Sequence, residues 1–400
     1  EELVGEVALL TGGTRTASVF ALRESELAHL SEDAFQKLIA DHPSLLRPVM
    51  QNLAQRLLKG ERGTPSQPAP KSVAIVPHPG LTGGPQIVAA LERALGTTAK
   101  LDVLDQARFD AQHGDGSAQL ARVDPRSAAL SEWMNLQERF DGLVVYIADS
   151  EPTAWTRRCV THADAIYLLA DAQSDPSPTP FEGWFTEHFP EVSPSLSLVL
   201  VHAADTASPR HTCRWLDPRP GVRHHHLRRQ NTRDVERLAR FVTGRAIGLV
   251  LSGGLARAFA HVGVLRALGE LGIPVDMVGG ASMGAAVAFG HAKGLLPDAL
   301  SEGIREIFLR HSMARSITWP SLSFLNTRRM EATLRRQTDD LDIEDLWLPY
   351  FAVSASLTHK RVQEHTRGRV WRAVRASGAM PVIMPPLLER GDVLVDGGML

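Results

Sequence analysis

Short runs of consecutive apolar residues recur between residues 72 and 201, and a stretch long enough to form a helix follows each of them. Unbroken apolar runs of this kind are typical of strands buried on both faces, as in parallel sheets covered by helices. The same alternation resumes at residue 247 and continues to the end of the chain. We therefore expect an α/β fold built on βαβ units. The four runs are Val73–Val76, Leu143–Ile147, Ala165–Leu169 and Leu198–Val201.

Stretches rich in proline and glycine divide the 400 residues into three segments. Residues 61–71 are rich in Pro, Gly and polar residues and are predicted to form a linker. The linker would separate an N-terminal segment, 1–60, from a middle segment, 72–244, and a C-terminal segment, 245–400, would follow. The chain starts without a methionine and stops directly after a Gly-Gly turn, so we expect a fragment that is cut at both ends.

The charge balance excludes some classes of partner. Lys and Arg total 43 against 45 Asp and Glu, so the basic excess that nucleic-acid binding usually requires is missing. The two cysteines, Cys159 and Cys213, form neither a disulfide framework nor a C-x-x-C pair, which favours a reducing, cytoplasmic setting. No apolar window of about 18 residues is free of charge, so no membrane span is predicted.

The middle segment has features that resemble ligand sites but do not meet their requirements. The glycine turn at 80–84 follows a predicted strand, yet its spacing fits neither phosphate-loop motif. The run His224–His226 cannot direct three neighbouring side chains at one metal, because successive residues of an extended chain point to opposite sides. We expect no metal site and a scaffold role, with these histidines and the stretch 155–159 in solvated or ion-paired loops. Cys159 itself is expected to be a packed thiol.

The N-terminal segment contains a turn with residues suited to a nucleotide. Gly5 allows a tight turn, Glu6 can accept hydrogen bonds from a ribose hydroxyl, and Arg15 can hold a phosphate with two parallel N–H donors. Alternation from Thr16 onward suggests a strand that leaves this loop. A hairpin with a surface ion pair between Glu6 and Arg15 is the alternative interpretation.

This turn resembles the phosphate-binding cassette of cyclic-nucleotide-binding domains, where the Glu contacts ribose and the Arg contacts the cyclic phosphate. The resemblance covers about the last third of such a domain, so only part of its β-barrel would be present. It implies a C-terminal helix over residues 31–58 and a tentative cAMP or cGMP site at Gly5, Glu6, Arg15 and Thr16. Thr16 departs from the Pro or Ser that is common in that family.

The C-terminal segment contains a G-x-S-x-G sequence centred on Ser282. A predicted strand, 275–278, precedes it and an apolar helix follows, which is the setting of a nucleophile elbow. Gly280 and Gly284 permit the sharp turn that exposes the serine hydroxyl at a helix N-terminus. A structural turn with an incidental serine is the alternative.

A glycine-rich loop lies upstream, after the predicted strand 247–251. Its Gly253 and Gly254 present bare backbone N–H groups, as the oxyanion of acyl transfer requires. A phosphate cradle is the competing interpretation, but no Walker lysine follows the loop.

A third element is Asp396, which a strand delivers to a Gly-Gly turn. A serine nucleophile needs a base, and in an α/β-hydrolase the histidine follows the acid along the chain. Here the candidate histidines precede Asp396, which favours a Ser–Asp dyad over a Ser–His–Asp triad. These histidines are His291, His311, His359 and His365.

The order of these three elements resembles the patatin-like phospholipases, and the order of the segments resembles the neuropathy target esterase group. The stretches 256–265, 345–351, 371–377 and 155–159 look like that group, so the resemblance covers nearly the whole chain. It implies a patatin-like three-layer α/β/α catalytic domain that is truncated at its C-terminus. Ser282 would be the nucleophile, Asp396 the base, and Gly253, Gly254, Leu255 and Arg257 the oxyanion loop. The implied reaction is ester hydrolysis in phospholipids or lysophospholipids, with no metal or other cofactor required.

The loop departs from the G-G-G-x-R-G pattern of that family at Leu255 and Ala258. Both replacements keep a backbone N–H but lose the ready access of glycine to positive φ and narrow the room beside the loop. We therefore expect an intact dyad with reduced activity. The alternative is an inactive protein that acts as a cyclic-nucleotide-responsive regulatory module.

A phospholipase must reach lipid without crossing the bilayer. The stretch Ile304–Leu325 mixes aromatic and aliphatic residues with arginines, as interfacial surfaces do. It predicts peripheral contact with the inner face of a membrane, although packing of these residues in the core is the alternative. The apolar members are Ile307, Phe308, Leu309, Ile317, Trp319 and Phe324, and the basic ones are Arg305, Arg310 and Arg315.

Overall fold

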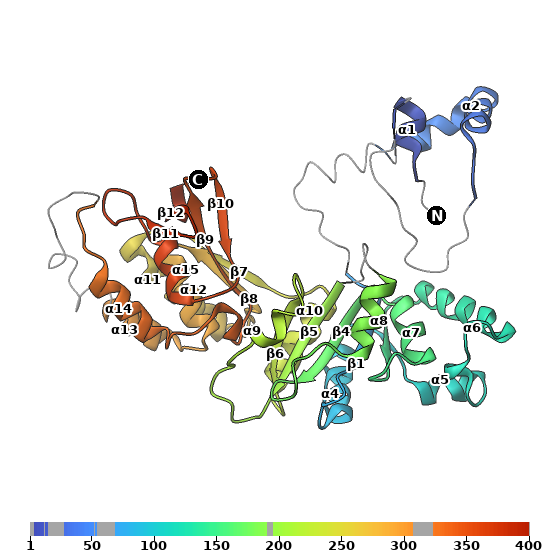
Figure 1. Ribbon diagram of the computed structural model, residues 1–400, viewed down its shortest axis with the longest axis horizontal. Coiled ribbons are helices and arrows are strands. Elements are labelled where there is room, and N and C mark those ends of the chain that lie inside the picture. The colour runs from blue at the N-terminus through green and yellow to red at the C-terminus, as the bar shows by residue number, and fades with distance from the viewer. Residues whose placement is uncertain are drawn as a thin grey trace.

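The computed structural model describes residues 4–11, 13–14, 28–51, 53, 69–189, 195–306 and 323–399. Figure 1 shows the middle segment in light blue to yellow-green and the C-terminal segment in yellow to red, each built around its own sheet. The predicted linker falls largely outside the described residues, which resume at residue 69. Within the described part of the chain, no helix is both long and apolar enough to cross a bilayer.

Among its described residues, the N-terminal segment contains the short α-helices α1 (Glu6–Thr11) and α2 (Glu32–Asp41), and residues 46–51 and 53 are also helical. Ser31 caps α2 by accepting a hydrogen bond from the backbone N–H of Ala34. The single helix expected over 31–58 is wrong, because α2 ends at Asp41 and a 3-10 turn begins at Pro43. Proline lacks the N–H that would continue the helix and disfavours helical backbone in the residue before it. The strand expected from Thr16 lies outside the described residues.

The middle segment forms a six-stranded, all-parallel sheet with the order β2-β3-β1-β4-β5-β6, as the apolar runs predict. Four strands match the predicted runs, whereas the edge strands β2 and β6 were not predicted. The strands are β1 (Ser72–Pro77), β2 (Leu101–Leu104), β3 (Leu143–Ile147), β4 (Ala165–Asp171), β5 (Ser195–His202) and β6 (Arg223–Arg228).

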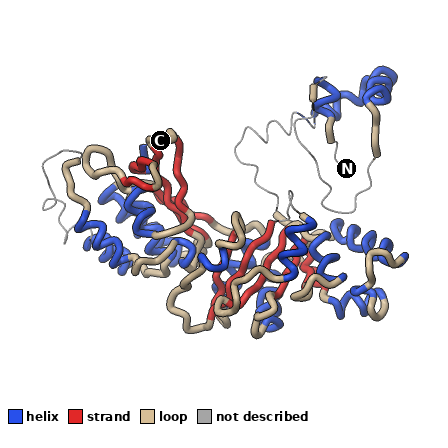
Figure 2. Tube along the Cα trace, in the orientation of Figure 1, coloured by secondary structure: helices blue, strands red, loops and turns tan. Residues whose placement is uncertain are grey.

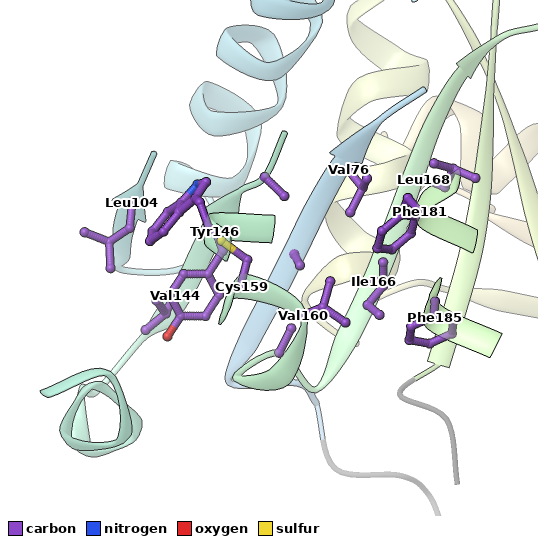
Figure 3. Packing of buried hydrophobic residues seen from close by; sticks show 14 of the residues in the cluster. Val76, Leu104, Val144, Tyr146, Cys159, Val160, Ile166, Leu168, Phe181 and Phe185 are labelled. Atoms are coloured by element: carbon purple, nitrogen blue, oxygen red, sulfur yellow. The ribbon is translucent and has the colours of Figure 1, made fainter. Parts of the chain in front are cut away.

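Helices cover both faces of this sheet, so successive residues of a strand enter different cores. In β1, Ala74 and Val76 pack into one cluster with Trp155 and Phe181, part of which Figure 3 shows. Val73 belongs to the cluster on the other face, where α4 and α10 pack. The helices are α4 (Gly84–Gly96), α5 (Gln106–His113), α6 (Pro125–Leu136), α7 (Ala154–Thr161), α8 (Pro180–His188), α9 (Cys213–Leu216) and α10 (Thr232–Val242).

The two polar stretches expected in solvated loops are instead buried, so that prediction is wrong. Residues 155–159 lie in α7, where Cys159 is a packed thiol as expected, and burial raises its pKa well above the usual value. The run His224–His226 lies in β6, with His225 and His226 buried. His224 and His226 both donate from Nε2 to the Glu344 carbonyl, at 3.1 and 2.8 Å, and burial lowers the pKa of all three histidines, which favours neutral rings.

The C-terminal segment forms a mixed sheet in which neighbouring strands run β11-β12-β9-β8-β7, with β10 also paired to β9. Figure 2 shows these strands in red beside the helices. The strands are β7 (Gly248–Leu251), β8 (Met277–Ala281), β9 (Tyr350–Ser356), β10 (Arg361–His365), β11 (Leu387–Glu389) and β12 (Asp392–Asp396). Its core gathers residues from the helices α11 (Phe259–Glu270), α12 (Met283–Ala292), α13 (Pro297–Arg305), α14 (Arg328–Gln337) and α15 (Val370–Ser377).

The three-layer arrangement expected for this segment is only partly visible. The buried residues of its helices form one hydrophobic cluster with the sheet. Val250 on β7 is 70% exposed, so that position of the sheet has no covering layer among the described residues. An α/β segment with a mixed sheet is therefore established, and the complete α/β/α sandwich stays a prediction.

Candidate active site

The sharp turn expected at Ser282 is present between β8 and α12. The backbone of Ser282 has φ +54° and ψ −125°, an uncommon conformation for a residue with a side chain. A Cβ added at Gly280 would lie 2.4 Å from the carbonyl oxygen of Leu251, and one at Gly284 would lie 2.1 Å from it. Both glycines are therefore required by close approach of the β7 backbone. The strand before the turn is β8, which begins at Met277 and not at the predicted residue 275.

Ser377, at the end of α15, holds the backbone of the elbow. The Ser282 N–H donates to the Ser377 hydroxyl oxygen at 2.8 Å, and that hydroxyl donates to the Val353 carbonyl at 2.5 Å. Ser377 is fully buried. The contact ties the turn to β9 and satisfies a buried backbone donor. Sequence analysis assigned no role to Ser377, although the stretch that contains it had been singled out for its resemblance to the esterase group.

The pairing of β9 brings the carboxyl ends of β8 and β12 together. β9 has three paired neighbours but only two edges, and the β10 pairing overlaps both of the others. β8 and β12 must therefore share one edge of β9, one after the other. Ala281, directly before Ser282, pairs with Val353, and Asp396 pairs with the next residue, Ser354. The two chain positions are thus offset by one residue, about 3.4 Å, along β9.

The end of α15 and the turn that follows it contact both candidate residues. Ser377 binds the Ser282 backbone, and two residues later the Ala379 carbonyl accepts a hydrogen bond from the Asp396 N–H at 2.9 Å. Asp396 is buried, and one of its carboxylate oxygens accepts from the Gly398 N–H at 2.8 Å. Its other oxygen accepts no hydrogen bond from the described part of the chain, which leaves it able to accept a proton.

No histidine of the described residues forms a hydrogen bond with Ser282 or Asp396. His261 bonds to the Ser252 carbonyl at 2.8 Å, and His365 bonds to the Ser354 hydroxyl at 2.8 Å. Burial lowers the pKa of His365. The hydrogen bonds that the triad interpretation requires are therefore missing among the residues in view.

The predicted oxyanion loop lies directly beside the elbow. A Cβ added at Gly253 would lie 3.0 Å from the Ser282 Cβ, so this glycine lets the loop approach the nucleophile. Arg257 lies in the following 3-10 helix, where its backbone N–H donates to the Gly254 carbonyl at 3.0 Å. Leu255 has φ +50°, in the region that favours glycine.

The second replacement in the loop behaves differently. Ala258 has φ −57°, an ordinary helical value, and is fully buried. The expectation that it suffers from losing access to positive φ is therefore wrong. The strain is confined to Leu255.

An apolar cavity of about 110 Å³ adjoins Ser282. Leu255 and Ile383 also line it, and four of its lining residues are methionines: Met283, Met330, Met380 and Met384. Flexible thioether side chains suit a cavity that must accommodate an apolar chain. Sequence analysis did not find this cavity, because its walls come from α12, α14, α15 and the loop after α15.

The tentative nucleotide site is described only in part. Gly5 has φ +87°, as its predicted turn requires, and α1 begins at Glu6. Arg15 and Thr16 lie outside the described residues. No cluster of metal-ligating side chains is present in the portion of the chain that the structure covers.

The glycine turn after β1 is closed by protein side chains. The Arg229 guanidinium donates to the Thr82 carbonyl at 2.6 Å and to the Thr82 hydroxyl at 2.8 Å, and it pairs with Asp171 at 2.8 Å. The scaffold role that the sequence predicts for this turn stays a prediction.

Three family models match the chain in sequence order. The cyclic nucleotide-binding domain matches residues 1–42, the neuropathy target esterase family P-loop like domain matches 72–246, and the patatin-like phospholipase model matches 249–400. The chain is therefore a patatin-like phospholipase homologue of the neuropathy target esterase family, with a partial cyclic-nucleotide-binding domain at its N-terminus.

Curated relatives align along essentially the whole chain. Neuropathy target esterase sws of Drosophila melanogaster is 31% identical over 442 residues, covering 99% of this chain and 31% of the relative. Patatin-like phospholipase domain-containing protein 7 of Rattus norvegicus is 31% identical, covering 100% of this chain and 33% of the relative. Lysophospholipase nte1 of Emericella nidulans is 29% identical, covering 100% and 31%. The chain thus spans about a third of the length of these relatives.

Proposed function

We propose that this chain is a serine esterase that uses Ser282 as nucleophile and Asp396 as base. The observation that carries the proposal is the meeting of β8 and β12 on one edge of β9. On that edge Ala281, the residue before Ser282, and Asp396 pair with two consecutive residues of β9. The strained elbow and the glycine loop beside it support the same assignment. We also propose the division into segments 72–244 and 245–400 as two domains.

The reaction would proceed in two steps. Asp396 accepts the hydroxyl proton as Ser282 Oγ attacks the acyl carbonyl, and backbone N–H groups of the loop at Gly253 and Gly254 stabilise the oxyanion. The ester oxygen then leaves as an alcohol with the proton from Asp396. In the second step, water gives its proton to Asp396 and attacks the acyl-enzyme, which releases a fatty acid and restores the serine.

The substrate class follows from the cavity and from the relatives. An apolar, methionine-lined space beside the nucleophile suits the acyl chain of an ester. One relative is named a lysophospholipase and others are named neuropathy target esterases. We propose phospholipid or lysophospholipid esters as substrates.

Labelling with a fluorophosphonate tests the nucleophile and hydrolysis tests the base. The parent chain should be labelled at Ser282 and should release fatty acid from lysophosphatidylcholine, whereas Ser282→Ala should do neither. Asp396→Asn keeps the shape of the side chain but removes the proton acceptor, so turnover should fall by about 10²-fold or more. Full activity in either variant would refute the dyad.

We propose that substrate enters from a lipid surface at the loop after α15. Residues 376–388 contain no charged side chain. The side chains of Val382 and Phe324 are exposed, and they lie next to each other because the Phe324 N–H donates to the Val382 carbonyl at 3.0 Å. The neighbouring Ile383 lines the cavity. Of the stretch expected to be interfacial, 307–322 lies outside the described residues. Val382→Asp should weaken binding to phosphatidylcholine vesicles, while Leu271→Asp, at the far end of α11, should not.

Regulation by a cyclic nucleotide is a second part of the proposal. The match of residues 1–42 to the cyclic nucleotide-binding domain supports it. The alternative function, an inactive regulatory module, is favoured by the positive φ of Leu255 in the oxyanion loop. Calorimetric binding of cyclic AMP without any fluorophosphonate labelling would select this alternative.

A further inference from the structure

The strand that leads to Ser282 and the strand against which Asp396 pairs both start next to the middle segment. β8 starts directly after Asp276 and leads to Ser282, and β9 starts shortly after Trp347 and supplies Val353. Figure 1 shows β7 and β8 running from the junction between the two sheets. Contacts at these starts can therefore set how the two strands lie relative to each other.

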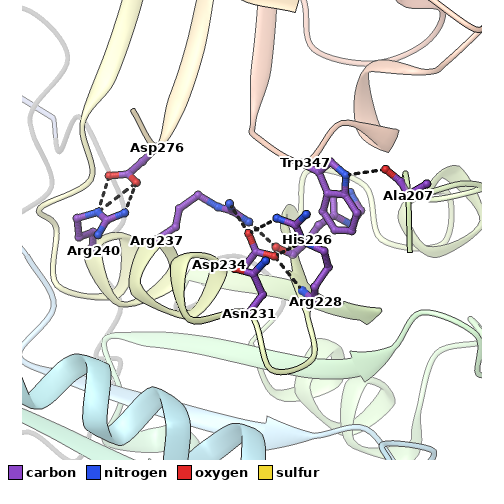
Figure 4. A network of polar contacts seen from close by, with 9 residues as sticks. All are labelled: Ala207, His226, Arg228, Asn231, Asp234, Arg237, Arg240, Asp276 and Trp347. Atoms are coloured by element: carbon purple, nitrogen blue, oxygen red, sulfur yellow. Dashed lines mark hydrogen bonds and ion pairs between the residues drawn. The ribbon is translucent and has the colours of Figure 1, made fainter. Parts of the chain in front are cut away.

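The start of β8 is held by an arginine of the middle segment. Arg240, on α10, donates from Nε to one carboxylate oxygen of Asp276 at 2.9 Å and from Nη2 to the other at 2.7 Å (Figure 4). Asp276 is only 1% exposed, and it also accepts from the Ile247 N–H at 2.9 Å. The Arg240 side chain is 21% exposed, and a bidentate pair of this kind fixes distance and orientation together.

The start of β9 is held by several backbone and side-chain contacts. The Trp347 indole N–H donates to the Ala207 carbonyl at 3.2 Å, and the Arg228 guanidinium lies 4.3 Å from the ring centre. His226 donates from Nε2 to the Glu344 carbonyl at 2.8 Å. A further contact runs from the Thr212 N–H to the Asp345 carboxylate at 2.9 Å.

The groups of the middle segment that make these contacts are themselves fixed. Asp234 pairs with Arg228 at 2.7 Å and with Arg237 at 2.8 Å, and Arg237 donates to the His226 carbonyl at 2.6 Å (Figure 4). Asp234 is buried. Two groups of polar contacts, both anchored on α10, therefore reach the starts of the two strands, one through Arg240 and the other through Asp234 and β6.

We propose that the middle segment is a positioning element of the esterase site, with Arg240 as its principal residue. The middle segment fixes the starts of β8 and β9 relative to each other. It thereby holds Ser282 in register with Val353, and so with Asp396, which pairs with the next residue of β9. This inference rests on the proposed function. Displacement of reacting groups by about 1 Å can cost about 10²-fold in rate, so a small slip between the two strands would be measurable.

The test compares Arg240, which pairs with Asp276 at the start of β8, with Arg219, which pairs only within the middle segment. Arg219 forms a buried bidentate pair with Glu182, at 2.5 and 2.9 Å, wholly inside the middle segment. Arg240→Lys and Arg219→Lys both keep the charge and lose the planar two-point contact. Each is made in the full chain. The assays are hydrolysis of a soluble short-chain ester and the rate of fluorophosphonate labelling, at a temperature well below both melting temperatures.

Arg240→Lys should lower kcat and the labelling rate about tenfold and leave KM within about twofold. Arg219→Lys should lower the melting temperature while kcat stays within about twofold of the parent. Equal kcat in Arg240→Lys and the parent would overturn the proposal, as would an equal loss in both variants, because that would indicate general destabilisation.

A milder variant covers the case in which Arg240→Lys does not fold. Trp347→Phe keeps a ring beneath Arg228 and removes the N–H that bonds to Ala207, and kcat should fall about threefold with KM unchanged. An unchanged kcat in this variant would overturn the proposal. Failure of the parent chain to label at Ser282 would instead refute the proposed function itself, so the two failures are distinguishable.

Discussion

Leu255→Gly should increase esterase activity without a large change in stability. Leu255 is a residue with a side chain at φ +50°, which costs about 1–2 kcal/mol that glycine does not bear. Glycine loses more freedom on folding, about 0.5–1 kcal/mol, so the net gain in the free energy of unfolding should be about 0–1.5 kcal/mol. The Leu255 side chain also lines the cavity that adjoins Ser282. Removing it should open that cavity.

The gain in rate can be estimated from the same strain. If about 1 kcal/mol of the strain opposes the loop geometry needed in the transition state, its removal raises kcat about fivefold. The measurement is the initial rate of fatty-acid release from lysophosphatidylcholine, together with the rate of fluorophosphonate labelling.

Two control variants separate the contributions. Leu255→Ala shortens the side chain and keeps the strained φ, so it reports the effect of the wider cavity alone. Ala258→Gly changes the other departure from the family pattern, at an ordinary φ of −57°, so it should lose about 0.5–1 kcal/mol of stability and gain no activity. A kcat for Leu255→Gly at or below that of the parent would refute the reasoning.

Three further changes test the elbow and the buried histidines. Ser377→Ala removes the acceptor of the Ser282 N–H, so we expect a loss of about 1–3 kcal/mol in denaturant unfolding and about tenfold slower labelling; parent-like labelling would contradict its role. Gly284→Ala would place a Cβ 2.1 Å from the Leu251 carbonyl, so the unfolding free energy should fall by about 1–3 kcal/mol, and an unchanged value would show that the turn can relax. Burial lowers the pKa of His202 from 6.5 to about 4 in the folded chain. As the pH falls, the unfolded chain therefore takes up this proton before the folded chain does, and folding loses stability. The contribution, about 3 kcal/mol, is fully present above pH 6.5 and is lost as the pH falls toward 4. His202→Gln should flatten melting temperature against pH over that range, and an unaltered slope would assign the dependence to other groups.

The sequence predicted the strands whose burial on both faces makes them apolar throughout. Leu143–Ile147 was predicted with the bounds that β3 has, because a strand covered on both faces is apolar throughout. The edge strand β6 was missed because its sequence, Arg223–Arg228, is polar, and only the network around Asp234 and Glu344 makes its burial tolerable. Tertiary partners of this kind leave no local signal in the chain.

The sequence predicted the site residues that belong to one short motif, and it missed those that the fold brings together from distant parts of the chain. Ser282 and its flanking glycines follow from one short motif in a strand–turn–helix setting. Ser377 and the methionine-lined cavity depend on which helices lie beside the elbow, and sequence spacing does not report that. The backbone strain at Leu255 could be suspected from its replacement of a family glycine, but only the structure separates it from the unstrained Ala258.

The shared edge of β9 has a consequence for biosynthesis. Ser282 leaves the ribosome more than a hundred residues before Asp396, and the strand that carries the acid can dock only against an edge already half occupied by β8. A nascent chain would therefore display a hydroxyl with no proton acceptor until its last described strand is added. Under the proposed dyad, hydrolytic competence therefore requires that the strand with Asp396 has docked, and a chain made only as far as β9 would lack it.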